Sequence, residues 1–537
     1  MTSCEKTTMV AGLLVKFTLL LGLLYFFVCS LSFLGDAFRL LGGKAAGKAF
    51  SSNAILSNPV SNLMMGILAT VLLQSSSTTT SIVVTMVAAD LLTVRPAIFI
   101  IMGSNIGTSV TNTIISLGQV SNRNEFRRAF AGATVHDMFN WLSVLCLLPV
   151  EWITGSIGSW HDCGLLCQLT GAMTRNLHVD KQAKQHELLK AITKPFTNLI
   201  IQLDKNVIKK FAKNEMVGNE TLVKHMCTRT RVETQAYLAE NNTCQVRYVM
   251  TTVTEHCNFL FEHIANTWSD DVLGVVLLVV ALVLLCACLV LIVKLLHSLL
   301  RGKIALVLRH FINADFPGVF RHLTGYVAIL VGAGLTMLVQ SSSIFTSALT
   351  PLVGVSVLHL DRMYPLILGA NIGTTFTAIL AALASDRSVF QKALQVALSH
   401  LFFNIFGILI WYPFPVMRRV PIGLAKRLGN TTAKYRWFAV AYLAAMFFVL
   451  PAFVFGLSVA GSAVLVGVGL PVFLFFVIVV IVNVLQSKKP SFLPRRLRTW
   501  GWLPLPLHSL APYDAAVGKV LGTCKRCVSS DDRPASD

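Results

Sequence analysis

The apolar sequence of this chain is interrupted by a polar run, residues 74–81, with apolar residues on both sides. The flanks, residues 64–73 and 82–89, each have about eight to ten residues. As helix this is roughly 12–15 Å, or half of a hydrocarbon core of about 30 Å. Lipid cannot satisfy the hydrogen-bonding groups of the run. We therefore expect each flank to cross half of a membrane, with a turn at the polar run.

The polar run recurs later in the chain together with its surroundings. Gln340-Ser341-Ser342-Ser343 lies 266 residues after Gln74-Ser75-Ser76-Ser77, and Gly369-Ala370-Asn371-Ile372-Gly373-Thr374 lies 266 residues after Gly103-Ser104-Asn105-Ile106-Gly107-Thr108. Four further residues recur after 264 positions, namely Phe126, His136, Asn140 and Pro149 as Phe390, His400, Asn404 and Pro413. A spacing that is kept over roughly eighty residues, through rare residue types, indicates an internal duplication.

Charges and glycosylation signals indicate how the chain is oriented. Residues 151–270 are polar, contain five cysteines and carry the sequons Asn219-Glu220-Thr221 and Asn241-Asn242-Thr243, which is typical of an extracellular segment. Basic residues follow both the apolar stretch 272–296 and the second repeat, so these two ends are expected in the cytoplasm. Because the first repeat ends outside and the second inside, the two are predicted to be inverted repeats.

The predicted fold class is an all-α polytopic membrane protein with two inverted-topology repeats, broken or re-entrant helices, flanking transmembrane helices and a large extracellular loop. Outside the repeats, spanning helices are expected at residues 10–34, 272–296, 438–457 and 464–485. The chain divides into a cytoplasmic N-terminus with the first transmembrane helix and an interfacial segment (1–62), repeat 1 (63–150), the glycosylated loop (151–270), a transmembrane helix and cytoplasmic linker (271–325), repeat 2 (326–413), a cytoplasmic loop with the terminal hairpin (414–486) and a cytoplasmic tail (487–537). Both termini are then cytoplasmic, and the sequon at Asn430 faces the cytoplasm unmodified.

The five cysteines of the loop leave the disulfide pairing open. We prefer Cys227 with Cys257, because these two bracket the sequon-bearing part of the loop. Cys163, Cys167 and Cys244 are also present, so at least one cysteine is unpaired or paired elsewhere, and the sequence does not decide which.

Composition excludes several classes of protein. Hydrophobic residues make up 54% of the chain and charged residues only 13%, whereas soluble domains are about a quarter charged. Much of the net charge of +20 lies beside apolar spans, and no basic-aromatic motif for nucleic acid accompanies it. No nucleophile–base pair or set of metal ligands occurs at a usable spacing, so we predict no enzyme, no catalytic residue and no cofactor.

The polar residues of the repeats suit a small oxyanion with sodium beside it. Hydroxyls and side-chain amides donate hydrogen bonds to an anion and also offer oxygens to a hard cation. The glycines of the Gly-x-Asn-Ile-Gly-Thr segments allow a helix break, where N-termini favour an anion and freed carbonyls favour sodium. Asn105 and Asn371 of these segments are therefore sodium candidates. The alternative, that the small residues serve only close helix packing, agrees less well with a duplicated polar run.

Asp137 is the acidic residue expected inside the first repeat. A carboxylate within a membrane is costly unless it is paired or hydrated, so Asp137 is a functional candidate. The alternative is a structural ion pair with Arg127 or Arg128. The matching position of the second repeat is Leu401, so only one repeat carries the acid.

Four features carry a resemblance to a known family: the paired Gln-Ser-Ser-Ser motifs, the Asn-Ile-Gly-Thr segments, the sequon-bearing loop and the sequence Ala131-Gly132-Ala133-Thr134-Val135-His136-Asp137. In these features the chain closely resembles the type II sodium-dependent phosphate cotransporters of vertebrate epithelia. The resemblance covers roughly residues 10–510 and implies sodium-coupled phosphate uptake across the apical plasma membrane. The phosphate-binding residues that it implies are Gln74, Ser75, Ser76, Ser77, Gln340, Ser341, Ser342 and Ser343. The sodium-binding residues that it implies are Gln119, Asp137, Asn140, Thr374 and Thr377, together with Gln340 and Ser341.

Two departures from the family pattern bear on one sodium site: Asn122 stands where the family usually has an acid, and Ala370 where it has a serine. Ala131, Ala133 and Asp137 resemble the electrogenic members, since the electroneutral branch has Ser, Ser and Gly at these positions.

Two alternatives to a sodium–phosphate symporter stay open at this point. One is a sodium- or anion-permeable channel, and the other is a sodium-coupled transporter of another oxyanion such as sulfate, because hydroxyl-lined sites suit both anions. The expected partners are Na+, inorganic phosphate and membrane lipid, with no nucleic acid, and cytoplasmic regulatory proteins are left open.

Overall fold

The structure is a computed structural model, and it describes residues 3–50, 58–88, 92–157, 163–175, 188–204, 207, 210, 221–224, 226–238, 244–257, 259–261, 267–299, 313, 315–383 and 390–515. Within these ranges, nine helices are long and apolar enough to cross a membrane. They include the four stretches predicted outside the repeats, as Leu14–Gly42, Asp270–Ile292, Phe438–Val459 and Ser462–Lys488. The chain is therefore a helical multi-pass membrane protein, and this part of the prediction is confirmed.

The first repeat opens with a helical hairpin at the polar run. Helix α3 (Pro59–Leu73) ends at Gln74, whose φ of 49° lies in the left-handed region, and α4 (Ser76–Ala88) follows. Across this turn the Thr70 hydroxyl donates to that of Thr79 at 3.1 Å, so α3 and α4 lie side by side. The turn expected here is confirmed. The repeat continues through α5 (Val94–Gly107), α6 (Val110–Leu117) and α7 (Arg123–Ile157).

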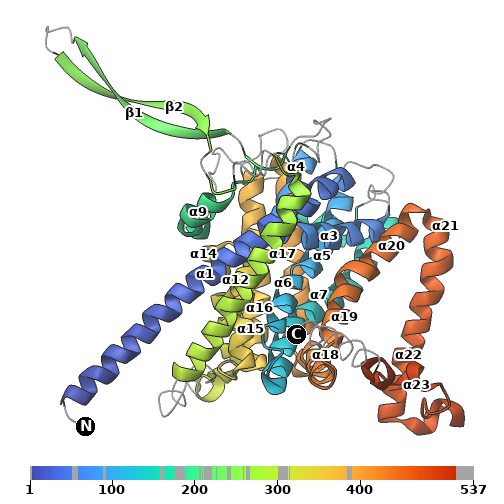
Figure 1. Ribbon diagram of the computed structural model, residues 1–537. Helices are drawn as coiled ribbons and strands as arrows, with labels where there is room; N and C mark the ends of the chain where they lie inside the picture. Colours follow the sequence, from blue (N-terminus) through green and yellow to red (C-terminus); the bar gives the residue numbers. More distant parts are fainter. Residues whose placement is uncertain are drawn as a thin grey trace, which may run out of the picture.

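The second repeat builds the same hairpin. Helix α14 (Leu323–Val339) ends at Gln340 with a φ of 54°, and α15 (Ser342–Gly354) follows. Then come α16 (Leu360–Leu383) and α17 (Phe390–Trp411). In Figure 1, α4 is near the end of the helical bundle from which the β strands project, while α15 is near the opposite end, on the side of α18 (Pro415–Lys434).

Close backbone contacts between two helices recur in both repeats. Gly103 on α5 faces α3 so tightly that a Cβ added to it would lie 1.9 Å from the Leu63 carbonyl oxygen. Gly369 on α16 faces α14 in the same way, with the Ile329 carbonyl oxygen at 2.0 Å. These pairs are 266 residues apart, like the polar runs. Only glycine allows such an approach, so the duplication predicted from sequence is also a duplication of packing.

The expected helix break at the Gly-x-Asn-Ile-Gly-Thr segments is wrong for the second repeat, where α16 runs through the segment without interruption. In the first repeat, α5 and α6 are separated only by Thr108 and Ser109, whose backbone angles are still those of a right-handed helix. The glycines here serve close helix contact instead of a break, which is the packing role weighed as the alternative.

The core lies where helices of the two repeats meet. Fully buried aromatic side chains come from α7 (Phe126, Phe130 and Phe139), from α16 (Tyr364) and from α17 (Phe403). Phe139 and Tyr364 join the two repeats, with ring centroids 6.3 Å apart. The repeats therefore form one helical body.

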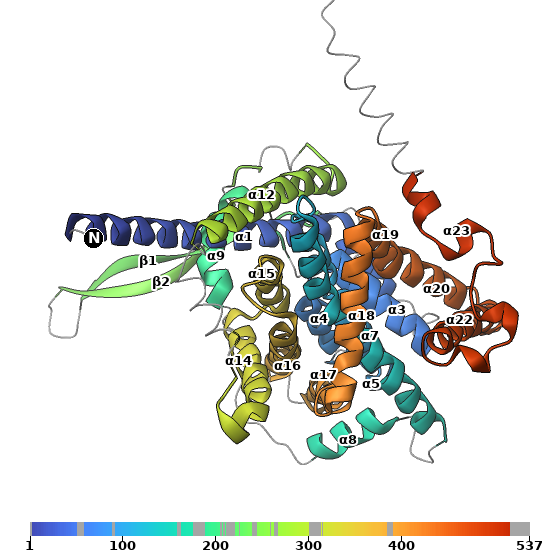
Figure 2. The ribbon, with the colours of Figure 1, turned by 90° about the horizontal axis from the view of Figure 1, so that it is seen from below.

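Two groups of helices flank this body on different sides (Figure 2). On one side α1 (Ser3–Phe50) packs against α12 (Asp270–Leu299). On the other, a terminal hairpin packs against α3 and consists of α19 (Phe438–Ala444), a π-helical segment (Ala445–Val449), α20 (Leu450–Val459), α21 (Ser462–Val464), a second π-helical segment (Leu465–Gly469) and α22 (Leu470–Lys488). A short helix, α23 (Leu505–His508), lies beyond it.

Helix α1 continues beyond the predicted first span to Phe50, so the interfacial segment expected after residue 34 is helical as far as that residue. Asp36 and Arg39 form an ion pair at 2.6 Å along this helix. Gly42 faces α3, with the Leu72 side chain 2.8 Å from the position of an added Cβ. Local pairing and helix packing therefore outweigh the low helix propensity of the glycines.

The long loop contains regular structure that the sequence analysis did not predict. It holds α8 (Leu165–Thr174), α9 (Leu188–Ile200) and an antiparallel pair of strands, β1 (Met226–Leu238) and β2 (Cys244–His256), which projects from the helices in Figure 1. The preferred cysteines, Cys227 and Cys257, form a disulfide bond at the base of this pair. The sequons at Asn219 and Asn241 lie outside the described residues, whereas Asn430 is exposed on α18.

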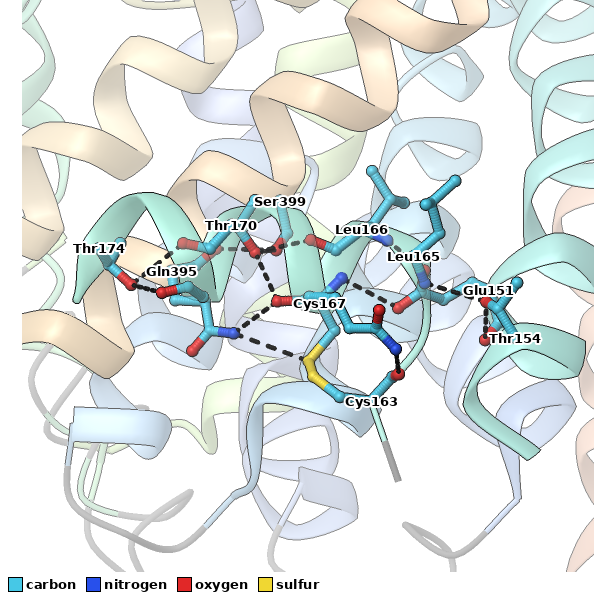
Figure 3. The surroundings of a disulfide bond; sticks show 12 residues. Glu151, Thr154, Cys163, Leu165, Leu166, Cys167, Thr170, Thr174, Gln395 and Ser399 are labelled. Atoms are coloured by element: carbon cyan, nitrogen blue, oxygen red, sulfur yellow. Dashed lines mark hydrogen bonds between the residues drawn. A yellow bond between two sulfur atoms is a disulfide. The ribbon is translucent and has the colours of Figure 1, made fainter. Parts of the chain in front are cut away.

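Helix α8 joins the end of α7 to α17 (Figure 3). Glu151 of α7 receives the Cys167 backbone N–H at 3.2 Å, so a carboxylate sits at the N-terminus of α8. The hydroxyls of Thr170 on α8 and Ser399 on α17 are 3.0 Å apart. A disulfide between Cys163 and Cys167 closes the first turn. The start of the predicted loop is thus packed against both repeats.

Candidate functional site

The two Gln-Ser-Ser-Ser tips have the same local structure. The Ser75 hydroxyl oxygen accepts from the Thr78 backbone N–H at 3.1 Å, and that of Ser341 accepts from Ile344 N–H at 3.3 Å, so each caps the following helix. Ser76 and Ser342 open these helices and are buried, while the other residues of both tips are half-buried. Two helix N-termini therefore begin at the polar runs, and such termini favour anions.

Each hairpin contacts the opposite repeat through hydroxyl groups. Thr377 on α16 of repeat 2 donates to the Ser77 hydroxyl of repeat 1 at 3.3 Å. In the other direction, Thr346 and Ser347 on α15 both donate to Asn112 Oδ1 on α6, each at 3.0 Å. The structure thus brings the tip of each repeat to a polar helix of the other.

The glutamines among the predicted site residues differ in their partners. Gln74 Oε1 accepts from the Thr111 hydroxyl at 2.9 Å. The backbone N–H of Gln340 donates to the Thr336 carbonyl oxygen at 2.7 Å, which ends α14. Gln119 is buried and donates to the Pro351 carbonyl oxygen on α15 at 3.3 Å. Its Oε1 has no hydrogen-bond partner within the described part of the chain, so it is an oxygen that a cation can use.

An amide and imidazole network joins the repeats with approximate two-fold symmetry. His136 Nε2 of repeat 1 lies 2.7 Å from Asn371 Oδ1 of repeat 2, and His400 Nε2 of repeat 2 lies 3.2 Å from Asn105 Oδ1 of repeat 1. Asn140 connects the two halves, because it accepts from Asn371 Nδ2 at 3.0 Å and donates to the Asn105 carbonyl oxygen at 2.7 Å. All five residues are buried. Three of the predicted sodium residues, Asn105, Asn140 and Asn371, are therefore in direct contact.

Thr374 and Thr377 lie on α16 beside the first tip. The Thr374 hydroxyl donates to the Ala370 carbonyl oxygen at 2.9 Å, and Thr377 reaches Ser77 as described. Both threonines are buried. Of these two predicted sodium residues, Thr377 contacts the Gln-Ser-Ser-Ser motif of the other repeat, whereas the Thr374 hydroxyl bonds within α16.

Asp137 has its hydrogen-bond partner outside both repeats. It is fully buried on α7, and its Oδ2 accepts from the Tyr442 hydroxyl on α19 at 3.1 Å. Its Oδ1 has no hydrogen-bond partner among the described residues. Its observed partner is thus a tyrosine of the terminal hairpin, not Arg127 or Arg128, which were the alternative.

The two departures from the family pattern have different surroundings. Asn122 is exposed and caps α7, since its Oδ1 accepts from the Asn124 backbone N–H at 3.0 Å. Ala370 is buried on α16 between Gly369 and Gly373, which contact α14, and the hydroxyl of Thr336 on α14 has no partner in the described ranges. Of the two positions, only Ala370 lies within the buried interior of the repeats.

Asn112, Thr111 and Tyr442 are polar residues of this region that the sequence analysis missed. Asn112 and Thr111 stand in a polar stretch of α6, Thr111-Asn112-Thr113, which could have been noticed as hydrogen-bonding residues inside an apolar span. Tyr442 gives no such signal, because it is 305 residues from its partner Asp137 and tyrosine is common in membrane helices.

Comparison with known proteins identifies the family. The family described as "Na+/Pi-cotransporter" matches residues 26–147 and again residues 304–425. The chain is 53% identical over 523 residues to Sodium-dependent phosphate transport protein 2B of Homo sapiens, covering 94% of this chain and 74% of that protein. It is 52% identical over 516 residues to Sodium-dependent phosphate transport protein 2A of Rattus norvegicus, covering 96% of this chain and 78% of that protein. No solved structure matches the chain. With identity at this level over nearly its whole length, the chain belongs to the type II sodium-dependent phosphate cotransporter family.

Proposed function

We propose that the chain is a sodium-coupled symporter that imports inorganic phosphate, mainly as divalent HPO4, across the plasma membrane. The observation that carries the proposal is the pair of equivalent tips, in which a glutamine in the left-handed region precedes a helix that starts at a buried serine. The relatives are named sodium-dependent phosphate transport proteins, which supports the same pair of ligands.

In this proposal, phosphate is bound by the N-termini of α4 and α15. It accepts hydrogen bonds from the hydroxyls of the two tips and from the backbone N–H groups of the first turns, with Gln74 and Gln340 beside it. The contacts of each tip with the opposite repeat support a site that both repeats form together.

Sodium is bound by the neighbouring amide, hydroxyl and carboxylate oxygens in this proposal. The candidates are Gln119, Asn140, Thr374, Thr377, Asn105, Asn371, Gln340 and Ser341, with Asp137 as the one carboxylate among them. Gln119 Oε1 and Asp137 Oδ1 are the strongest individual candidates, because both atoms are buried and neither has a hydrogen-bond partner within the described residues. Leaving a buried oxygen without a hydrogen bond costs free energy, and a cation that binds to the oxygen removes this cost.

The repeats are inverted in the membrane in this proposal. The positions of α4 and α15 toward opposite ends of the bundle in Figure 1 support it. The loop is extracellular with glycans on Asn219 or Asn241 or both, the termini are cytoplasmic, and the membrane is the apical plasma membrane of epithelial cells. Deglycosylation of single sequon variants expressed in animal cells tests this arrangement. A mobility shift that depends on Asn430 would contradict it.

The test of the function is uptake of radiolabelled phosphate with and without a sodium gradient. We expect accumulation of phosphate above its external concentration when the only driving force supplied is the sodium gradient. A channel cannot accumulate phosphate in this way. Equilibration of phosphate without accumulation would therefore indicate a channel and contradict the symporter. Unlabelled sulfate at the same concentration should leave uptake unchanged, and strong competition by sulfate would instead indicate a broader oxyanion transporter.

A further inference from the structure

Tyr442 lies outside both repeats but donates a hydrogen bond to Asp137, the one buried carboxylate among the described residues of the repeats. It stands on α19, in the terminal hairpin, and its hydroxyl is 3.1 Å from Asp137 Oδ2. Tyrosine and carboxylate are both buried. No residue of repeat 2 has a corresponding arrangement, because Leu401 occupies the position of Asp137 there.

Aromatic rings hold the tyrosine in place. The Tyr442 ring meets Phe130 of α7 with centroids 5.7 Å apart, Phe438 of α19 at 6.4 Å and Phe447 of the first π-helical segment at 6.5 Å. Two of these contacts are edge-to-face, a favourable geometry for aromatic pairs. The hydroxyl is thus directed at the carboxylate by packing that does not itself involve Asp137.

The hydrogen bond fixes one oxygen of the carboxylate and leaves the other without a hydrogen-bond partner among the described residues. The Ser109 side chain also lies beside the carboxylate, but its hydroxyl donates to the Ile106 carbonyl oxygen at 3.1 Å. The terminal torsion of an aspartate is broad and nearly two-fold, so a carboxylate without a fixed contact samples several orientations. With Oδ2 held by Tyr442, Oδ1 keeps one direction, and it has no hydrogen-bond partner within the described residues. A cation that binds at Oδ1 then meets an oriented ligand.

We propose that Tyr442 is a positioning residue for sodium: it orients the Asp137 carboxylate so that Oδ1 serves as a cation ligand. Sodium coupling then depends in part on the terminal hairpin, which carries Tyr442. This inference rests on the proposed function, because it assumes that Asp137 takes part in sodium coupling.

The variant Tyr442→Phe tests the inference, since it removes the hydroxyl and keeps the ring. Sodium-activated current and labelled phosphate uptake are measured in the same voltage-clamped oocytes, with surface protein measured by biotinylation. We expect normal surface protein, a rise of about tenfold in the sodium concentration for half-activation, and less charge moved per phosphate. Tyr442→His, which keeps a ring with an N–H donor, should lie closer to wild type on both measures.

Tyr364→Phe is the matched control. Tyr364 is also buried, and its hydroxyl also donates a hydrogen bond, to the Trp411 carbonyl oxygen at 3.5 Å and not to Asp137. This control should leave sodium activation and the charge per phosphate unchanged. If it shifts both as strongly as Tyr442→Phe does, loss of any buried hydroxyl explains the effect and the positioning role is overturned.

A double-mutant cycle separates an action through Asp137 from an independent one. In the Asp137→Gly background, Tyr442→Phe should cause no further change in sodium activation. An equal shift in both backgrounds, or a single variant with wild-type or tighter sodium activation, would overturn the inference while the proposed function stands. A wild type that takes up no phosphate in sodium would overturn the proposed function itself, and the inference with it.

Discussion

Thr70 on α3 and Ser104 on α5 share a hydrogen bond of 2.9 Å in repeat 1. Repeat 2 has Thr336 and Ala370 at the matching positions, so the serine hydroxyl is missing and the Thr336 hydroxyl has no partner within the described residues. Yet the helices around both pairs cross through the same close glycine contacts. The two repeats therefore keep one packing arrangement and carry different polar groups on it.

The difference at Asp137 has the same character. Repeat 1 places a carboxylate where repeat 2 has Leu401, while the amide and imidazole pairs around it are kept in both halves. Close packing leaves little freedom to change volume, whereas a polar group can be gained or lost at a position without moving the backbone. Under the proposed function, the duplicated packing determines where a site forms, and the polar residues that differ between the repeats determine which ions it binds.

The largest effect is expected from the shared packing. A Cβ at Gly66 would lie 2.0 Å from the Ile100 carbonyl oxygen, and one at Gly332 would lie 2.2 Å from that of Leu366. Backbone atoms must move to make room for the added methyl group. Gly66→Ala and Gly332→Ala should therefore each lower the free energy of unfolding by about 3 kcal/mol. We expect little mature protein at the cell surface for either variant, measured by biotinylation.

Gly334 provides the control on the same helix as Gly332. A Cβ there would meet no atom within 4 Å, so Gly334→Ala should reach the surface normally. If only one of the two repeats were sensitive to its glycine substitution, the packing would not be shared in the way that we describe.

The next largest effect is expected at the two Gln-Ser-Ser-Ser tips, which we propose contribute equally to phosphate binding. Ser76→Leu and Ser342→Leu should abolish phosphate uptake at normal surface expression, because each removes a ligand oxygen and fills the site. The Ala variants lose about 1.5–3 kcal/mol each, roughly ten- to hundredfold in affinity for phosphate. Uptake and surface protein are measured for the same cells.

Thr85 is the control for the first tip. It lies on α4, further from the tip, and its hydroxyl donates to the Ser81 carbonyl oxygen at 2.7 Å. Thr85→Leu should keep most of the uptake. Normal transport by both Ser→Leu variants would show that the tips do not form the site.

The smallest effect tests the polar difference between the repeats. Ala370→Ser restores in repeat 2 the hydroxyl that Ser104 supplies in repeat 1, and it gives the buried Thr336 hydroxyl a partner. We expect a gain of about 1 kcal/mol, seen as a rise of roughly 1–2 °C in the Tm of the purified protein in detergent. Ser104→Ala should lower the Tm by a similar amount. A lower Tm for Ala370→Ser would mean that repeat 2 has no room for the missing group.

The parts of the fold that follow from local pattern could be predicted from the sequence. Apolar length gave the spans outside the repeats, and the fixed spacing between the polar runs gave the duplicated hairpins with Gln74 and Gln340 at their turns. The unbroken course of α16 could not be predicted, because glycines that allow a break also allow close packing, and only the position of α14 decides between them.

The duplication marks only part of the candidate site. Asn105 and Asn371 could be predicted because they belong to repeated segments, and the structure connects both to Asn140, which the family resemblance implied. Tyr442 lies outside the repeats and contacts Asp137, which is 305 residues away in the sequence. No periodicity or motif therefore predicts this contact. The β1 and β2 strands were missed for a related reason: an isolated strand pair depends on pairing between segments more than on either segment alone.

The most direct test of the account is the charge moved per phosphate in wild type and in Asp137→Gly. A carboxylate in the interior offsets the burial of one extra sodium, whose desolvation would otherwise cost several kcal/mol. Net positive charge then enters with each divalent phosphate, and the membrane potential contributes about 2.3 kcal/mol per charge per 100 mV. We expect an inward phosphate-evoked current for wild type in sodium, and for Asp137→Gly continued uptake of labelled phosphate with the current largely lost. An unchanged charge-to-phosphate ratio in the variant, or a wild type that transports phosphate without current, would contradict it.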